Sequence, residues 1–269
     1  ADVTKAELIR LMANRELTNQ FPKVRAPRGD EALRVEHLTR AGVLNDISFT
    51  LYRGEVLGIA GLLGSGRTEL ARAIFGADKI DSGNIYRKGQ LQLIHSPQQA
   101  IQSGIGFLTE DRKTQGLVLP LSVKDNVCLP NVNQFSRFGI VSNTAENQAA
   151  QRYVNELRIK TPSIHQQVVN LSGGNQQKVV LGKWLCSQAE IFIFDEPTRG
   201  IDVGSKAEIY ELINQLTANG VAVLMISSEL PEILGMSDRI LVMHQGRING
   251  EFAADEATQE KILRCALGE

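Results

Sequence analysis

The stretch that decides the fold of this chain is Leu171-Ser172-Gly173-Gly174-Asn175-Gln176-Gln177. Taken alone, a serine and two glycines ahead of an apolar-faced helix could be no more than a helix N-cap. The position of the stretch is more specific, because Asp195 lies 24 residues after Leu171, at the end of a run of four apolar residues. What the stretch indicates therefore depends on the chemistry of the segments around it.

Two acids, Asp195 and Glu196, close the apolar run 191–194. Such a run is typical of a strand buried on both faces of a parallel sheet. A carboxylate at the end of that strand suits Mg²⁺ coordination, which we expect of Asp195. Glu196 would then be placed to polarise an attacking water. The alternative is a strand that leaves the core through two acids, and it is preferred unless a phosphate site lies nearby.

A glycine-rich segment supplies that phosphate site, because residues 61–68 read GLLGSGRT between an apolar strand and a helix. The spacing is that of a P-loop, with Arg67 in place of the usual lysine. Glycines let backbone N–H groups surround an anion, and the helix N-terminus adds positive potential. We expect Mg²⁺ to be held by Thr68 and Asp195, and nucleotide to be bound by Gly61, Gly64, Ser65, Gly66, Arg67, Thr68 and Glu69.

Together these segments resemble the ATPases of ABC transporters, and the resemblance covers about Leu33 to Gly268. It narrows to the second ATPase half of tandem subunits in monosaccharide importers of the ribose, galactose, arabinose and xylose type. The segments that carry this narrower resemblance are 61–70, 109–113, 171–178, 195–204 and 227–232. It implies ATP and Mg²⁺ as cofactors, and ATP hydrolysis that powers sugar uptake.

The resemblance also implies partners and a location. In this family two ATPase units meet head to tail, so Ser172, Gly173 and Gly174 would contact nucleotide held by the other half. Further expected partners are transmembrane permease subunits and, indirectly, a periplasmic sugar-binding protein. The chain would be a soluble, peripheral protein at the cytoplasmic face of the inner membrane. A net charge of −1 excludes the strongly basic surface of a nucleic-acid-binding protein, so no nucleic-acid partner is expected.

Three positions depart from the family pattern. Glu110 stands where the family offers a glutamine to Mg²⁺ and water, and Ser228 stands where a histidine contacts the γ-phosphate. No aromatic residue lies around Gly42, where the family stacks one on adenine. We therefore count Glu110 and Ser228 with Asp195 and Glu196 as catalytic positions, and we expect weak nucleotide binding and slow hydrolysis.

Three hypotheses follow for the function. The first is a working ATPase half. The second is a regulatory half that contributes its signature, the stretch Leu171–Gly174, to the partner's site and hydrolyses little ATP itself. The third is an ABC protein of DNA repair or translation, which would require long coiled-coil insertions or a basic patch, and the sequence contains neither.

The fold expected is α/β, with a mixed sheet around the P-loop helix, an antiparallel β portion and an inserted helical lobe at about 113–169. Apolar fractions of 42% and charged fractions of 22% exclude disordered, collagen-like and membrane-embedded chains. Strands are expected at 33–38, 47–51, 55–60, 90–94, 191–194 and 221–226, helices at 67–75 and 209–216, and a hairpin at 240–248.

The two ends of the chain resemble each other, because residues 4–10 and 258–264 share a threonine, an apolar pair and an arginine in one register. We therefore interpret residues 1–20, with a short capped helix, as the tail of a preceding ATPase half. Residues 21–32 contain prolines, a glycine and several charges, and are expected to form a linker. The ATPase domain itself is expected to span residues 33–269.

Overall fold

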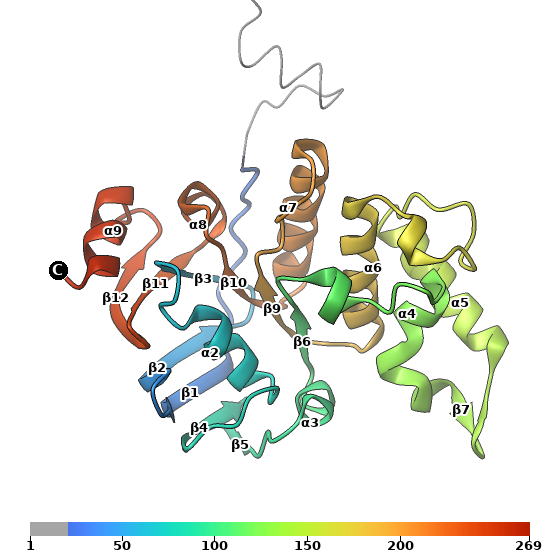
Figure 1. Ribbon diagram of the computed structural model, residues 1–269, viewed down its shortest axis with the longest axis horizontal. Helices are drawn as coiled ribbons and strands as arrows, with labels where there is room; N and C mark the ends of the chain where they lie inside the picture. The colour runs from blue at the N-terminus through green and yellow to red at the C-terminus, as the bar shows by residue number, and fades with distance from the viewer. Residues whose placement is uncertain (1–20) are drawn as a thin grey trace, which may run out of the picture.

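A mixed six-stranded sheet forms the centre of the computed structural model, which describes residues 21–269 (Figure 1). The strand order is β12-β11-β3-β10-β9-β6, and β12 is the antiparallel member. The strands are β3 (Val56–Gly61), β6 (Ile105–Leu108), β9 (Ile191–Asp195), β10 (Ala222–Ile226), β11 (Arg239–His244) and β12 (Arg247–Ala253). Every residue of β6, β9 and β10 is buried, as expected of strands whose two faces are covered.

A second, antiparallel sheet has the order β2-β1-β4-β5. Its strands are β1 (Glu31–Arg40), β2 (Leu44–Tyr52), β4 (Ser82–Arg87) and β5 (Gln90–Gln92). Helix α2 (Arg67–Ile74) lies between the two sheets, while α7 (Val203–Ala218) and α8 (Leu230–Met236) cover the other side of the large sheet (Figure 1). The mixed sheet and the antiparallel β portion expected from the sequence are thereby confirmed.

A largely helical lobe lies at one end of the molecule, between β6 and β9 in the chain (Figure 1). It contains a π-helical turn at Arg112–Gly116, α4 (Val123–Cys128), α5 (Asn143–Glu156) and short 3₁₀ segments at Leu129–Phe135 and Val168–Asn170. A small hairpin of β7 (Ser136–Arg137) and β8 (Ile140–Val141) was not predicted. Helix α6 (Gly173–Cys186) packs against α4 and α5 and also contacts β6, so it joins the lobe to the sheet.

The remaining helices are α3 (Pro97–Gln102), beside β6, and α9 (Gln259–Leu267), which packs on β11. Within residues 21–269, each helix is too short or too polar to cross a lipid bilayer. The short helix and the end repeat predicted for residues 1–20 lie outside the described residues. The division into a preceding tail, a linker and an ATPase domain stays a prediction.

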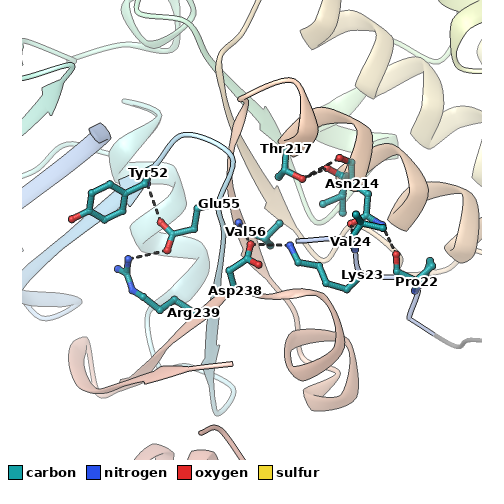
Figure 2. Close-up of polar contacts among 11 residues, drawn as sticks. Pro22, Lys23, Val24, Tyr52, Glu55, Val56, Asn214, Thr217, Asp238 and Arg239 are labelled. Carbon is teal, nitrogen blue, oxygen red and sulfur yellow. Dashed lines mark hydrogen bonds and ion pairs between the residues drawn. The ribbon is translucent and has the colours of Figure 1, made fainter. Parts of the chain in front are cut away.

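The segment that precedes β1 is packed on the core. The Lys23 Nζ lies 2.8 Å from Asp238 Oδ2, which also accepts the Val56 N–H at 2.8 Å (Figure 2). The Phe21 ring packs on Tyr210, with ring centroids 5.6 Å apart. The expected linker is therefore tied to the first residue of β3, the strand that ends at the glycine-rich loop.

Candidate nucleotide site

The glycine-rich loop connects β3 to α2, which is the strand–loop–helix context that a P-loop requires. Gly64 and Gly66 have φ angles of 77° and 100°, in the left-handed region that glycine adopts without strain. A Cβ at Gly61 would lie 2.5 Å from Ser65 Oγ and 2.6 Å from the Met243 carbonyl oxygen. The loop conformation thus depends on these glycines.

A cavity of about 480 Å³ lies beside the loop. From the predicted site it is lined by Gly64, Ser65, Gly66, Arg67, Thr68, Glu69, Glu110, Glu196 and Ser228. Gly61 and Asp195 do not line this cavity: Gly61 ends β3 at the start of the loop, and Asp195 is buried at the end of β9, where it interacts with Thr68. The structure therefore brings the P-loop, both acids and the two departing positions to one place.

Asp195 is the last residue of β9 and is 1% exposed. Burial raises its pKa to about 6, the Thr68 hydroxyl and the Arg67 charge oppose that rise, and the charge of Glu196 adds to it. Within residues 21–269 neither carboxylate oxygen makes a hydrogen bond of ordinary geometry. A buried, unsatisfied carboxylate next to a hydroxyl is a site that a hard cation would stabilise, so these residues fit Mg²⁺.

Glu196 follows directly, in the left-handed region with φ of 52°. Its N–H donates to the Ile226 carbonyl oxygen at 2.9 Å, and the Ser228 hydroxyl donates to its carboxylate at 3.0 Å. Burial raises the pKa of Glu196, and the bond from Ser228 acts against that rise. Backbone strain of this kind gathers at functional sites. Ser228 therefore contacts the acid that is expected to polarise water.

Arg67 is turned toward the end of β10. Its Nη1 donates to the Ser227 carbonyl oxygen at 3.0 Å. Burial lowers the pKa of Arg67, and the charges of Glu196 and Asp195 partly restore it. Its pKa remains far above neutrality in any protein setting, so the guanidinium supplies a fixed positive charge facing both acids.

Glu110 does not present an isolated charge to the cavity, because its carboxylate forms an ion pair with the Arg199 guanidinium. Glu110 stands where the family offers a neutral glutamine, and this ion pair offsets the negative charge that the carboxylate would otherwise bring to the cavity. Arg199 lies in the segment 195–204 that carries the family resemblance, but no role was predicted for it. The available signal was a lone arginine three residues after Glu196.

Arg112 links three segments that are distant in the sequence. Its guanidinium donates to the side chain of Gln176 on α6 at 3.4 Å and to the backbone oxygens of Arg199 and Gly200 at 3.0 and 3.3 Å. A Cβ at Gly173 would lie 2.6 Å from its Nη2. Arg112 therefore forms an internal bridge between its own segment, α6 and residues 199–200.

The signature residues lie away from the P-loop. Ser172 and Gly174 line a separate cavity of about 240 Å³, beside Asp202 and Ser205. Ser172 is the N-cap residue of α6, yet its hydroxyl accepts from the Asn175 amide at 2.8 Å and caps no N–H of the described helix. A simple capping role therefore does not account for the serine.

The cavity of about 480 Å³ beside the glycine-rich loop is called the phosphate cavity below. A third cavity, of about 680 Å³, adjoins it and shares Gly64, Gly66 and Glu69 with it; we call this one the base-side cavity. Its other walls come from the turn 41–45 and from Gln245 and Gly246. The described residues that line it include no aromatic side chain. A nucleotide with phosphates at the loop would place its base here, where it finds no ring to stack on.

Comparisons with known proteins agree with this geometry. A family profile described as ABC transporter matches residues 44–199. The chain is 54% identical to the xylose import ATP-binding protein XylG of Thermoanaerobacter pseudethanolicus, over 98% of this chain and 54% of that protein. It is 48% identical to the ribose import ATP-binding protein RbsA of Bacillus subtilis, over 97% of this chain and 53% of that protein. The chain thus spans about half the length of the curated relatives it matches.

Among solved structures, the ADP conformation of MJ1267, an ATP-binding cassette of an ABC transporter, has the same fold. Its TM-score is 0.75 at 22% identity, over 89% of this chain and 100% of that chain. The fold and site define an ABC-type ATPase domain, and the chain belongs to the ABC transporter family. The resemblance indicated by the sequence motifs is confirmed at this level.

Proposed function

We propose that this chain is the second ATPase half of a tandem monosaccharide-import subunit, and that it binds Mg-ATP and hydrolyses it to drive uptake. The observation that carries the proposal is that the P-loop and Glu196 line one cavity, while Asp195 is buried beside it and interacts with Thr68 and Arg67 of the loop. The length relation supports the tandem arrangement, because relatives named as sugar import ATP-binding proteins are about twice as long as this chain.

The proposed division of labour follows from the contacts. Thr68 and Asp195 would hold Mg²⁺, which when bound offsets the charge of the phosphates. Backbone N–H groups of residues 64–68 and the Arg67 guanidinium would hold the phosphates. Glu196, held by Ser228, would orient and polarise the attacking water, since its raised pKa makes it a better proton acceptor than an ordinary carboxylate.

The signature is proposed to act on nucleotide held by the other half. Ser172 and Gly174 line a cavity different from that of the P-loop, which supports a role outside this chain's own site. The expected partners are that other half, permease subunits and, indirectly, a periplasmic sugar-binding protein. The expected location is peripheral, at the cytoplasmic face of the inner membrane.

The test is ATP hydrolysis by the complete subunit with Glu196→Gln. We expect a large loss of turnover, at least about 10²-fold, because removal of a general base has effects of this order. Glu229→Gln is the matched control, because Glu229 lines the same cavity but pairs outward with Lys206 at 2.6 Å. Turnover unchanged by the Glu196 substitution would reject the working site.

A regulatory half that lends its signature and hydrolyses little ATP is the second candidate. It is favoured by Ser228, which stands where the family has a histidine that contacts the γ-phosphate. The short Ser228 side chain instead donates its hydrogen bond to Glu196. Ser228→His combined with Arg67→Lys, in a subunit whose partner site is inactivated, should accelerate steady-state hydrolysis. If the unmodified site is already as fast as the doubly substituted one, slow turnover is not a property of these two residues.

A further inference from the structure

The phosphate cavity contains two guanidinium groups with different surroundings. Arg67 is largely buried, bonded to the Ser227 carbonyl oxygen and exposed to the charges of Asp195 and Glu196. The Arg199 side chain is 63% exposed and pairs with Glu110, which is 42% exposed. An ion pair with this much exposure contributes little free energy, so the guanidinium can exchange its partner readily.

The backbone at Arg199 is fixed although its side chain is exposed. Its N–H donates to the Glu196 carbonyl oxygen at 3.1 Å, and its own carbonyl oxygen accepts from Arg112 at 3.0 Å. The backbone of Arg199 is therefore held by two hydrogen bonds, while its exposed side chain can change orientation within the cavity. A guanidinium held in this way loses less conformational freedom when it binds an anion than one on a mobile loop.

The position of Arg199 identifies the phosphate it would contact. The base-side cavity meets the phosphate cavity at Gly64, Gly66 and Glu69. Arg199, Glu110 and Glu196 line the phosphate cavity alone and take no part in the base-side one. The bond from the Arg199 N–H to the Glu196 carbonyl oxygen further places Arg199 beside the acid that the proposed function assigns to the attacking water, and so beside the terminal phosphate of a nucleoside triphosphate.

On the basis of the proposed function, we propose that Arg199 is a ligand of the terminal phosphate, with Glu110 as its counterion in the nucleotide-free protein. On binding a triphosphate the guanidinium exchanges the carboxylate for phosphate oxygens, which it can contact through two N–H groups at once. A diphosphate lacks the terminal phosphate of a triphosphate, so the Glu110–Arg199 pair remains closed. Arg199 thus makes the site selective for triphosphate over diphosphate.

The experiment titrates this chain, with Mg²⁺ present, with ADP and with an ATP analogue that resists hydrolysis. We expect Arg199→Met to weaken binding of the ATP analogue by about tenfold or more, the effect of losing a hydrogen bond between charged groups, and to leave ADP binding unchanged. Arg199→Lys should retain part of the preference. Glu110→Gln releases the guanidinium and should strengthen binding of the analogue by up to about fivefold.

Arg152→Met is the matched control. Arg152 and Glu156 form an exposed ion pair on α5, 67% and 47% exposed, and neither residue lines the nucleotide cavities. If Arg199→Met weakens both nucleotides equally, or neither, the inference is wrong while the proposed function stands. If the unsubstituted chain binds neither nucleotide, the proposed function fails and this inference fails with it.

Discussion

Replacing Asp195 with asparagine should stabilise the nucleotide-free protein at neutral pH, although the residue is placed at the centre of the site. The carboxyl is 1% exposed, and its pKa in the folded chain is about 6, against an ordinary value of 3.8. The shift of about 2 units corresponds to about 3 kcal/mol, at 1.36 kcal/mol per unit. This is the free energy by which ionised Asp195 opposes folding.

The sign of the pH dependence follows from the direction of the shift. Because the pKa is raised on folding, the folded chain holds more protons than the unfolded chain between about pH 4 and 6. The stabilising contribution of protonated Asp195 is complete below pH 3.8 and is lost as the pH rises through about 6. Asparagine carries no charge at any pH, so Asp195→Asn should be more stable than the parent by up to about 3 kcal/mol at pH 7.5.

The assay is urea unfolding of both proteins from pH 4 to 7.5 in the presence of a chelator. The difference between the two free energies of unfolding isolates the contribution of this residue. Asp78→Asn serves as a control of opposite sign, because the hydrogen bond from Arg72 lowers the pKa of Asp78. A difference at pH 7.5 that is zero, or that favours the parent, would refute the argument from burial.

The same samples test the Mg²⁺ assignment. Adding Mg²⁺ and nucleotide should stabilise the parent protein, because a ligand that binds only the folded state shifts the unfolding equilibrium. Asp195→Asn should gain much less from that addition. An equal gain in both proteins would show that Asp195 is not a metal ligand.

Three further outcomes are expected. Lys23→Met leaves Asp238 without its cation and should lower the free energy of unfolding by about 1–3 kcal/mol in urea titrations. The control Arg25→Met replaces an exposed residue nearby and should change that free energy by less than about 0.5 kcal/mol. Equal effects of the two variants would mean that the ion pair does not hold the segment that precedes β1. Arg112→Met removes three hydrogen bonds, one to Gln176 on α6 and two to the backbone of residues 199–200, and should lower the free energy of unfolding by about 1–3 kcal/mol. A loss below about 0.5 kcal/mol would contradict the role of Arg112 as a bridge. Ala41→Tyr places an aromatic ring in the base-side cavity and should strengthen ATP binding, measured by calorimetry, by about 1–3 kcal/mol. Ala41→Leu is the control for side-chain size, and an equal effect of leucine would exclude stacking on the base.

Strands β9 and β10 were predicted because their burial is recorded in consecutive apolar residues, whereas β6, which is equally buried, was missed because its four residues include Gly106. Every residue of β10 is apolar, and β9 is apolar up to its last residue, Asp195. A local pattern is therefore enough to identify both strands. Strand β4 was missed because it begins Ser-Gly-Asn and owes its conformation to pairing with β1. Strand propensity depends on such neighbours, which a local reading cannot supply.

The candidate site divides in the same way. The P-loop and the two acids were predicted because each follows directly from a strand end, and strand ends in a parallel sheet meet at one edge. The pair of Glu110 and Arg199 was missed because it joins two segments whose approach depends on how the chain returns from the helical lobe. The roles of Arg112 depend on the same return.

The departures at Glu110 and Ser228 look like independent losses in the sequence, but each has a partner within the structure. Ser228 donates to Glu196, and Glu110 is neutralised by Arg199. Because the Glu110 side chain is 42% exposed and Ser228 is also exposed, water alone could satisfy both groups, so burial does not force these two contacts. Ser228 contacts the acid that is expected to polarise water, and the exposed Glu110–Arg199 pair lies at the wall of the phosphate cavity, where Arg199 can exchange its partner. Under the proposed function, the altered positions are a second way of organising an ATP site rather than the remains of the first.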